Sequence, residues 1–185
     1  MQTSRERNII LVTTFNLTFN PENNKMTLSR FAIYAATMFT LAAPAFADSV
    51  VSVTLRDTGA TTDLSKSMGL GMAMKGDMKT AIMSIDINPK SVLQGKVKFN
   101  VKNASTTVIH EMILAPVKDS NAPLPYLDKD NKVDEESAVH LGEVSELDPG
   151  KSGSLSVEMK PGKYVLYCNI VGHYMAGMWT IIDVR

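Results

Sequence analysis

Tyr164-Val-Leu-Tyr-Cys-Asn-Ile-Val-Gly-His-Tyr-Met-Ala-Gly-Met-Trp179 is the stretch that decides how this chain folds and what it binds. Its spacing, C-x4-H-x4-M, brings together the only cysteine (Cys168), a histidine (His173) and a methionine (Met178). A strand-like run precedes Cys168 and another follows Met178, and two glycines lie between Cys168 and Met178. A thiolate, an imidazole and a thioether on one short loop can hold a soft metal ion.

The composition fits one ordinary globular domain. The chain has 185 residues, of which 44% are hydrophobic and 21% charged, and its formal net charge is zero. That length is enough to bury a core, and the charge balance gives no sign of nucleic-acid binding. A single cysteine excludes an internal disulfide and an all-cysteine zinc site within one chain.

Short runs of β-branched or alternating residues, separated by Pro, Gly and Asp turns, predict about seven to eight strands. The clearest alternation is Gly95 to Lys102, with Val97, Phe99 and Val101 on one face. Two polar stretches, 57–79 and 116–136, are expected to be long connections with short helical pieces. The expected strands are 49–55, 81–88, 95–102, 107–115, 138–144, 152–159, 163–168 and 178–184. This pattern predicts an all-β fold, a Greek-key β-sandwich.

The N-terminal part reads as a targeting segment. A basic region precedes an apolar run from Phe31 to Ala43, and Ala45-Phe46-Ala47 fits the small-x-small rule for signal peptidase. We therefore expect a signal peptide at 26–47, cleaved after Ala47, and export to the periplasm; a retained anchor is the alternative. Since signal peptides begin chains, residues 1–25 are interpreted as a non-native extension before a start at Met26. The single domain would be 48–185, with a first strand and Met-rich loop at 48–80 and the core at 81–185.

His110, in an earlier strand-like run, supplies a further nitrogen donor. With Cys168, His173 and a thioether, the set becomes His2Cys plus methionine, which suits a trigonal copper site with a weak axial ligand. Three simpler or rival interpretations stay open. Cys168 can be an inert buried thiol, His110 can be a core or surface histidine, and Met175 competes with Met178 for the axial position. The place of Met178 at the start of the next strand favours it.

Four segments resemble the cupredoxins, the blue-copper family of plastocyanin, azurin, rusticyanin and sulfocyanin. They are Val97-Lys-Phe-Asn-Val-Lys-Asn103, Thr107-Val-Ile-His-Glu111, Leu147-Asp-Pro-Gly-Lys-Ser-Gly-Ser-Leu155 and Pro161 to Met178. The resemblance covers 81–184 and implies equatorial ligands His110, Cys168 and His173, an axial Met178 and one type 1 copper ion. The Cys-to-His gap resembles azurin and rusticyanin, and the His-to-Met gap resembles plastocyanin and rusticyanin. Many members carry Asn after the first histidine, where this chain has Glu111.

The predicted function is that of a monomeric single-electron carrier, not an enzyme. Its partners would be redox proteins that dock transiently near an exposed edge of His173, with no nucleic acid and no stable membrane insertion after signal cleavage. The apolar docking patch is expected at Ile170, Val171, Tyr174, Met175 and Ala176.

A cluster of methionines supports a second hypothesis. Its members, close together in the loop and the strand after it, are Met68, Met72, Met74, Met78 and Met83. Methionine is a flexible filler, so packing over the sandwich end is the simpler interpretation. The alternative is a thioether site for Cu(I), which would suit a protein for copper homeostasis or delivery.

Overall fold

The computed structural model describes residues 48–59 and 63–185. The expected signal segment 26–47 and extension 1–25 lie outside the described residues, so both stay predictions. Within the described ranges, no helix is long and apolar enough to span a membrane.

Eight strands of six or more residues form the framework of the described part of the chain, each overlapping a segment predicted as a strand. They are β1 (Ser49–Asp57), β2 (Met83–Asn88), β4 (Gly95–Asn103), β5 (His110–Val117), β8 (Gly142–Leu147), β9 (Ser152–Met159), β10 (Gly162–Tyr167) and β11 (Trp179–Val184). The short elements are β3 (Ser91–Val92), β6 (Tyr126–Leu127), β7 (Lys132–Val133), α1 (Glu135–Ala138), and the 3-10 turns η1 (Met78–Thr80) and η2 (Tyr174–Ala176). The small β6–β7 hairpin inside 116–136 was not anticipated.

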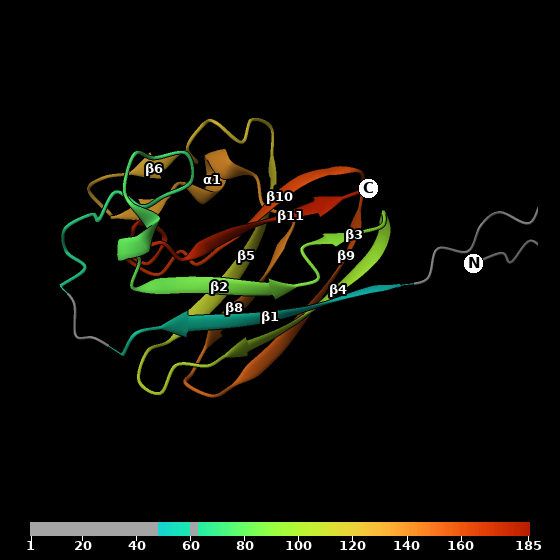
Figure 1. Ribbon diagram of the computed structural model, residues 1–185, viewed down its shortest axis with the longest axis horizontal. Helices are drawn as coiled ribbons and strands as arrows, with labels where there is room; N and C mark the ends of the chain where they lie inside the picture. The colour runs from blue at the N-terminus through green and yellow to red at the C-terminus, as the bar shows by residue number, and fades with distance from the viewer. Residues whose placement is uncertain (1–47, 60–62) are drawn as a thin grey trace, which may run out of the picture. The chain divides into compact units, whose positions relative to one another are not determined.

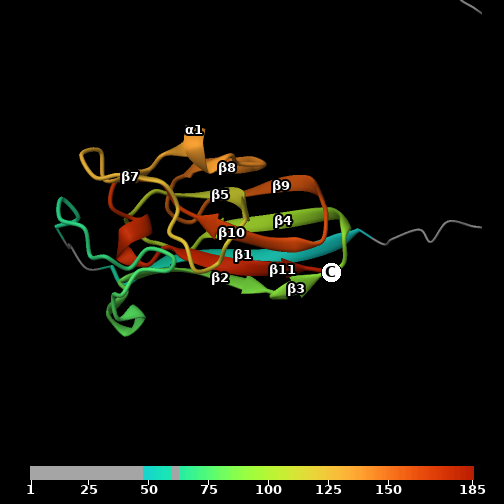
Figure 2. The ribbon, with the colours of Figure 1, turned by 90° about the horizontal axis from the view of Figure 1, so that it is seen from above.

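The strands form two main sheets (Figures 1 and 2). One has the order β2-β1-β4-β9 and the other β3-β11-β10-β5-β8. The chain changes sheet from β2 to β3, from β3 to β4, from β4 to β5, from β8 to β9 and from β9 to β10. This non-sequential order, with antiparallel pairs and a parallel β1–β4 pair, confirms the predicted Greek-key β-sandwich.

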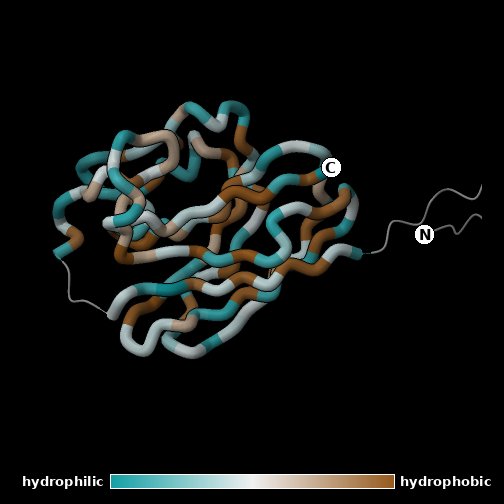
Figure 3. Tube along the Cα trace, viewed as in Figure 1, coloured by the Kyte–Doolittle hydropathy of each residue, from teal (hydrophilic) through white to brown (hydrophobic). Residues whose placement is uncertain are grey.

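The main core lies between the two sheets. Alternate residues of β4, namely Val97, Phe99 and Val101, are fully buried there, as the alternation along this strand predicted. Figure 3 shows the corresponding change between hydrophobic and hydrophilic residues along the strands. The three β4 side chains pack against side chains from the second sheet, such as Leu114 and Leu166.

A second, smaller core covers the outer face of the five-stranded sheet. Ile113 and Val165 point into it and meet Leu124 and Val133 from the 116–136 connection. Both faces of β5 and β10 are therefore buried, which explains why these two strands are apolar almost without interruption.

The cover segment, residues 63–76 of the Met-rich loop, packs against the turn between β10 and β11. Leu70 N donates to Met175 O at 3.1 Å, and Met72 N donates to the Tyr174 hydroxyl at 2.9 Å. Trp179 Nε1 donates to Leu70 O at 2.7 Å. Figures 1 and 2 show this loop and η2 at the same end of the sandwich, away from the C-terminus.

Candidate metal centre

The three predicted equatorial ligands come together at that end of the sandwich. Cys168 directly follows β10, His173 precedes η2, and His110 is the first residue of β5. Two main-chain bonds close the connecting loop: Cys168 N donates to Met178 O and Met178 N to His173 O, each at 3.1 Å. Gly177, with φ of 98°, makes the left-handed turn that brings the chain back to β11.

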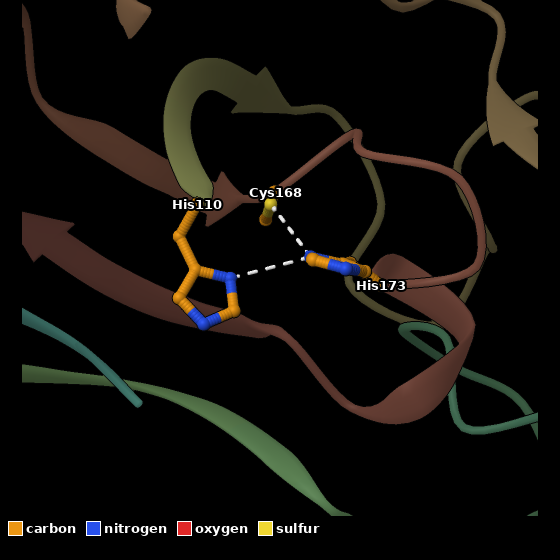
Figure 4. Close-up of side chains that lie close together, drawn as sticks. All are labelled: His110, Cys168 and His173. Carbon is orange, nitrogen blue, oxygen red and sulfur yellow. Dashed lines mark hydrogen bonds between the residues drawn. The ribbon is translucent and has the colours of Figure 1, made fainter. Parts of the chain in front are cut away.

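The donor atoms lie close enough to share one ion. The Nδ1 atoms of His110 and His173 are 3.3 Å apart, and the Cys168 Sγ lies 3.4 Å from the His173 Nδ1. One donor atom from each residue lies within 4.8 Å of the others. Figure 4 shows the two rings and the sulfur converging, with His173 joined by a dashed line to each of the other two groups.

Burial determines the protonation state of the metal-free centre. All three side chains are buried. Burial lowers the pKa of His110, partly offset by Asp57, and with the neighbouring His110 it lowers the pKa of His173 to about 4. Burial raises the pKa of the Cys168 thiol to about 12. Both imidazoles are thus neutral near pH 7, with lone pairs free for a metal, while the thiol must release its proton on metal binding.

Met178 is better placed than Met175 to be the fourth donor. Met178 is fully buried and belongs to the same core cluster as Cys168. Met175 belongs to the second core, where its Sδ lies 3.2 Å from the position that a Cβ on Gly71 would take. The two methionines therefore face different parts of the molecule. The axial role of Met178 stays a prediction.

Glu111 connects the two ligand-bearing segments. Its backbone N donates to the Cys168 Sγ at 3.5 Å, and its Oε1 accepts a 2.9 Å hydrogen bond from Asn169 N. Asn169 in turn contacts β7, because its Oδ1 accepts from Val133 N at 2.6 Å. Burial raises the pKa of Glu111, and the bond from Asn169 opposes that effect. The carboxylate thus holds together the strand that begins at His110 and the residue after Cys168.

Two supporting features were not found from the sequence. Asn103 Nδ2 donates to Val108 O and Leu147 O, both at 2.8 Å, which fixes the loop before His110. Asp57 Oδ2 lies 3.1 Å from His110 Nε2. Burial alone would raise the pKa of Asp57, but hydrogen bonds from Ser105, His110 and Gly59 outweigh it and lower the pKa. Asp57 lies far from His110 in sequence, and no local motif marked it.

The expectation that His173 has an exposed edge is wrong. His173 is only 4% exposed. Leu64 of the cover segment packs on Gly172, and Asn131 links the two segments by accepting from Gly172 N and donating to Leu64 O.

The expected docking patch is also mostly inaccessible. Tyr174, Met175 and Ala176 are buried, whereas Val171 is 50% exposed and Ile170 half-buried. These residues are covered by a loop that is distant in sequence, and no local motif indicates this contact.

The methionines of the loop occupy separate environments. Met72 is buried in the second core with Tyr174, Met68 packs against the main core, and Met83 is buried within β2. Met74 and Met78 are exposed. This distribution favours the packing interpretation over a single site that gathers the sulfurs.

No protein-family model matches the sequence, and no curated protein matches it. Among solved structures, the chain is similar to a reduced auracyanin from Roseiflexus castenholzii (17% identity, TM-score 0.42, covering 75% of this chain and 98% of that one). It is also similar to auracyanin B (20%, 0.43, 74% and 88%). A third match is rusticyanin from Thiobacillus ferrooxidans (14%, 0.46, 76% and 80%). These proteins are cupredoxins, the family that the sequence motifs resemble. At such low identity the similarities give no residue roles.

Proposed function

We propose that this protein binds one copper ion at His110, Cys168, His173 and Met178 and carries single electrons between redox partners. The observation that carries the proposal is the convergence of two imidazole nitrogens and one cysteine sulfur within 4.8 Å. A buried His2Cys donor set with a nearby thioether suits a type 1 copper site. Zinc is a poorer match because methionine is not among its usual ligands.

Bound copper would supply the one-electron couple, and the protein would supply a fixed set of donors. His110 sits on β5, paired with β10, and the loop from Cys168 to Met178 is closed by its own main-chain bonds. Donors held in this way keep their positions when the oxidation state changes, which keeps the reorganisation on electron transfer small. The fully buried Cys168 also keeps water away from the sulfur.

Export and partner docking complete the proposal. The apolar run and Ala45-Phe46-Ala47 pattern support delivery to the periplasm. The exposed Val171, two residues before His173, supports transient docking at the ligand loop, since redox encounters use small interfaces. We assign the protein the role of a carrier rather than that of an enzyme.

The visible spectrum of the copper-loaded full chain tests the proposal. We expect an intense thiolate-to-copper charge-transfer band that disappears in Cys168→Ser and is lost or strongly altered in His110→Ala. His140→Ala is the matched control, because His140 is exposed and distant in sequence from the three ligands. A wild-type protein that binds copper without this band does not have a type 1 site.

Copper delivery is the second candidate function. Its support is the cover segment and the adjoining turn, where Met74 is 37% and Met78 is 45% exposed. Exposed thioethers are suitable first contacts for Cu(I). Transfer of Cu(I) to an acceptor without net electron exchange, slowed in a Met74→Ser, Met78→Ser double variant, would distinguish delivery from electron transfer.

A further inference from the structure

The nitrogen of His110 that faces away from the metal centre contacts a carboxylate. His110 Nε2 lies 3.1 Å from Asp57 Oδ2, while His110 Nδ1 faces His173. The His110 side chain is fully buried and that of Asp57 is 7% exposed. The pair therefore lies in a region shielded from water, where a charge-assisted hydrogen bond is strong.

Asp57 is held in place from several directions. It is the last residue of β1 and pairs with Met83 of β2. Its Oδ1 accepts a 2.7 Å hydrogen bond from Gly59 N, and Gly59 turns the chain with φ of 69°. The strand pairing and the turn thus fix the position of the Asp57 side chain, with Oδ2 toward His110.

This contact determines which His110 nitrogen carries the proton. A neutral imidazole has one N–H donor and one acceptor nitrogen, whereas an ionised carboxylate only accepts. His110 Nε2 must therefore carry the hydrogen and donate it to Asp57. The lone pair is left on Nδ1, the atom that faces His173.

We propose that Asp57 is a positioning residue for the metal centre, which fixes His110 in the Nε2–H tautomer and favours the oxidised form of the bound ion. The second effect follows because a negative charge on the far side of the imidazole makes Nδ1 a stronger donor. This inference rests on the copper site proposed above. In metal sites, removal of such a hydrogen-bond partner weakens metal binding by about 10- to 100-fold.

The first measurement uses the metal-free wild-type chain. Long-range ¹⁵N–¹H correlation spectra of the imidazoles should show His110 with the proton on Nε2 and Nδ1 unprotonated. In Asp57→Ala the fraction of the Nε2–H tautomer should fall. A wild-type His110 with the proton on Nδ1 overturns the inference, even if no variant folds and whether or not the protein proves to bind copper.

The second measurement is the reduction potential of the copper-loaded protein. In Asp57→Asn we expect the ratio of Cu(I) to Cu(II) affinity to rise about tenfold, equivalent to a potential higher by about 59 mV for a one-electron couple. Asp86→Asn is the control for charge, because Asp86 is an exposed carboxylate paired with Arg56 at 2.8 Å. Its potential should stay at the wild-type value.

The outcomes separate this inference from the proposed function. An absent charge-transfer band in the wild type refutes the copper site itself. An intact band with the same potential in Asp57→Asn and wild type refutes the role of Asp57. An equal shift in Asp86→Asn also refutes it, because the effect would then be one of net charge.

Discussion

Replacing Glu111 tests whether a carboxylate can link the ligand-bearing segments in this protein. The substitution Glu111→Ala removes the only side-chain acceptor that Asn169 N has in the described structure, at 2.9 Å. Asn169 is buried, so water cannot readily replace the lost bond. A buried donor left without a partner costs about 1–3 kcal/mol. We expect the free energy of unfolding of the metal-free protein to fall by that amount.

Glu111→Gln separates the hydrogen bond from the charge. The amide oxygen of the glutamine can still accept from Asn169 N. Because the glutamine is uncharged, the variant avoids the free-energy cost of burying a charge, which is the cause of the raised pKa of Glu111. When an acidic side chain has a higher pKa in the folded than in the unfolded protein, the free energy of unfolding falls as the pH rises from the unfolded pKa through the folded pKa. Glu111→Gln should therefore equal wild type at acidic pH and be the more stable protein at pH 7.

Urea unfolding at several pH values, followed by fluorescence of the single tryptophan, measures both effects. Glu143→Ala is the control, because Glu143 is exposed and its carboxylate accepts only from the neighbouring Ser145 hydroxyl in the described structure. It should change stability by no more than about 0.5 kcal/mol. If Glu111→Gln is as unstable as Glu111→Ala at pH 7, the hydrogen bond to Asn169 is not the interaction that matters.

Three further predictions follow from the centre and its cover. Met178→Leu should shift the charge-transfer spectrum and raise the potential, whereas Met175→Leu should leave the spectrum unchanged; equal effects would contradict the assignment of the axial ligand. Trp179→Phe removes the 2.7 Å bond to Leu70 O and should cost about 1 kcal/mol, seen as faster amide exchange in the cover segment but not in β4. The pKa of His173 falls from 6.5 to about 4 on folding, so the unfolded chain binds more protons between these values. Stability of the metal-free protein should therefore fall by roughly 3 kcal/mol as pH drops through that window, and thermal melts that do not change between pH 7 and pH 4 would contradict this.

The strands and the closeness of Cys168 to His173 could be predicted because their signals are local. Strict alternation along 95–102 fixes a half-buried strand, and the C-x4-H-x4-M spacing places three donors on one turn. The predicted ends of the strands were wrong by a few residues at places where hydrogen-bond pairing with other segments, not residue propensity, determines where a strand begins or ends. Thr107 to Ile109 lie outside β5, for example, because the Ser105 hydroxyl accepts from Thr107 N and Val108 N and holds this segment in a turn.

The contacts that sequence could not provide are those between distant segments. Asp57 and His110 are 53 residues apart, and Trp179 and Leu70 are 109 apart. The composition of the cover segment, residues 63–76, does not indicate which surface the segment covers. The need for glycine at position 71 is visible only in the folded structure, because a Cβ there would lie 2.7 Å from the ring of Tyr174. Register across a sheet can be inferred from alternation, but the docking of an irregular loop cannot.

The cover segment bears on the choice between electron transfer and copper delivery. Release of copper past His173 requires the cover to open, which exposes the buried Leu70 and Met72. Opening also breaks three hydrogen bonds, those of Leu70 with Met175 and Trp179 and that of Met72 with the Tyr174 hydroxyl. Each buried side chain contributes about 1.5–3 kcal/mol and each hydrogen bond about 1 kcal/mol. The open form would then lie about 6–9 kcal/mol above the closed one.

Such a gap means that fewer than about one molecule in 10⁴ is open at any time. A carrier that keeps its copper through many redox cycles benefits from this, whereas a delivery protein needs an acceptor that opens the cover itself. The exposed Met74 and Met78 are the groups that such an acceptor would meet first. Copper exchange with a small chelator should therefore be slow in the wild type and faster in Trp179→Phe. Fast exchange in the wild type would mean that the cover does not retain the ion.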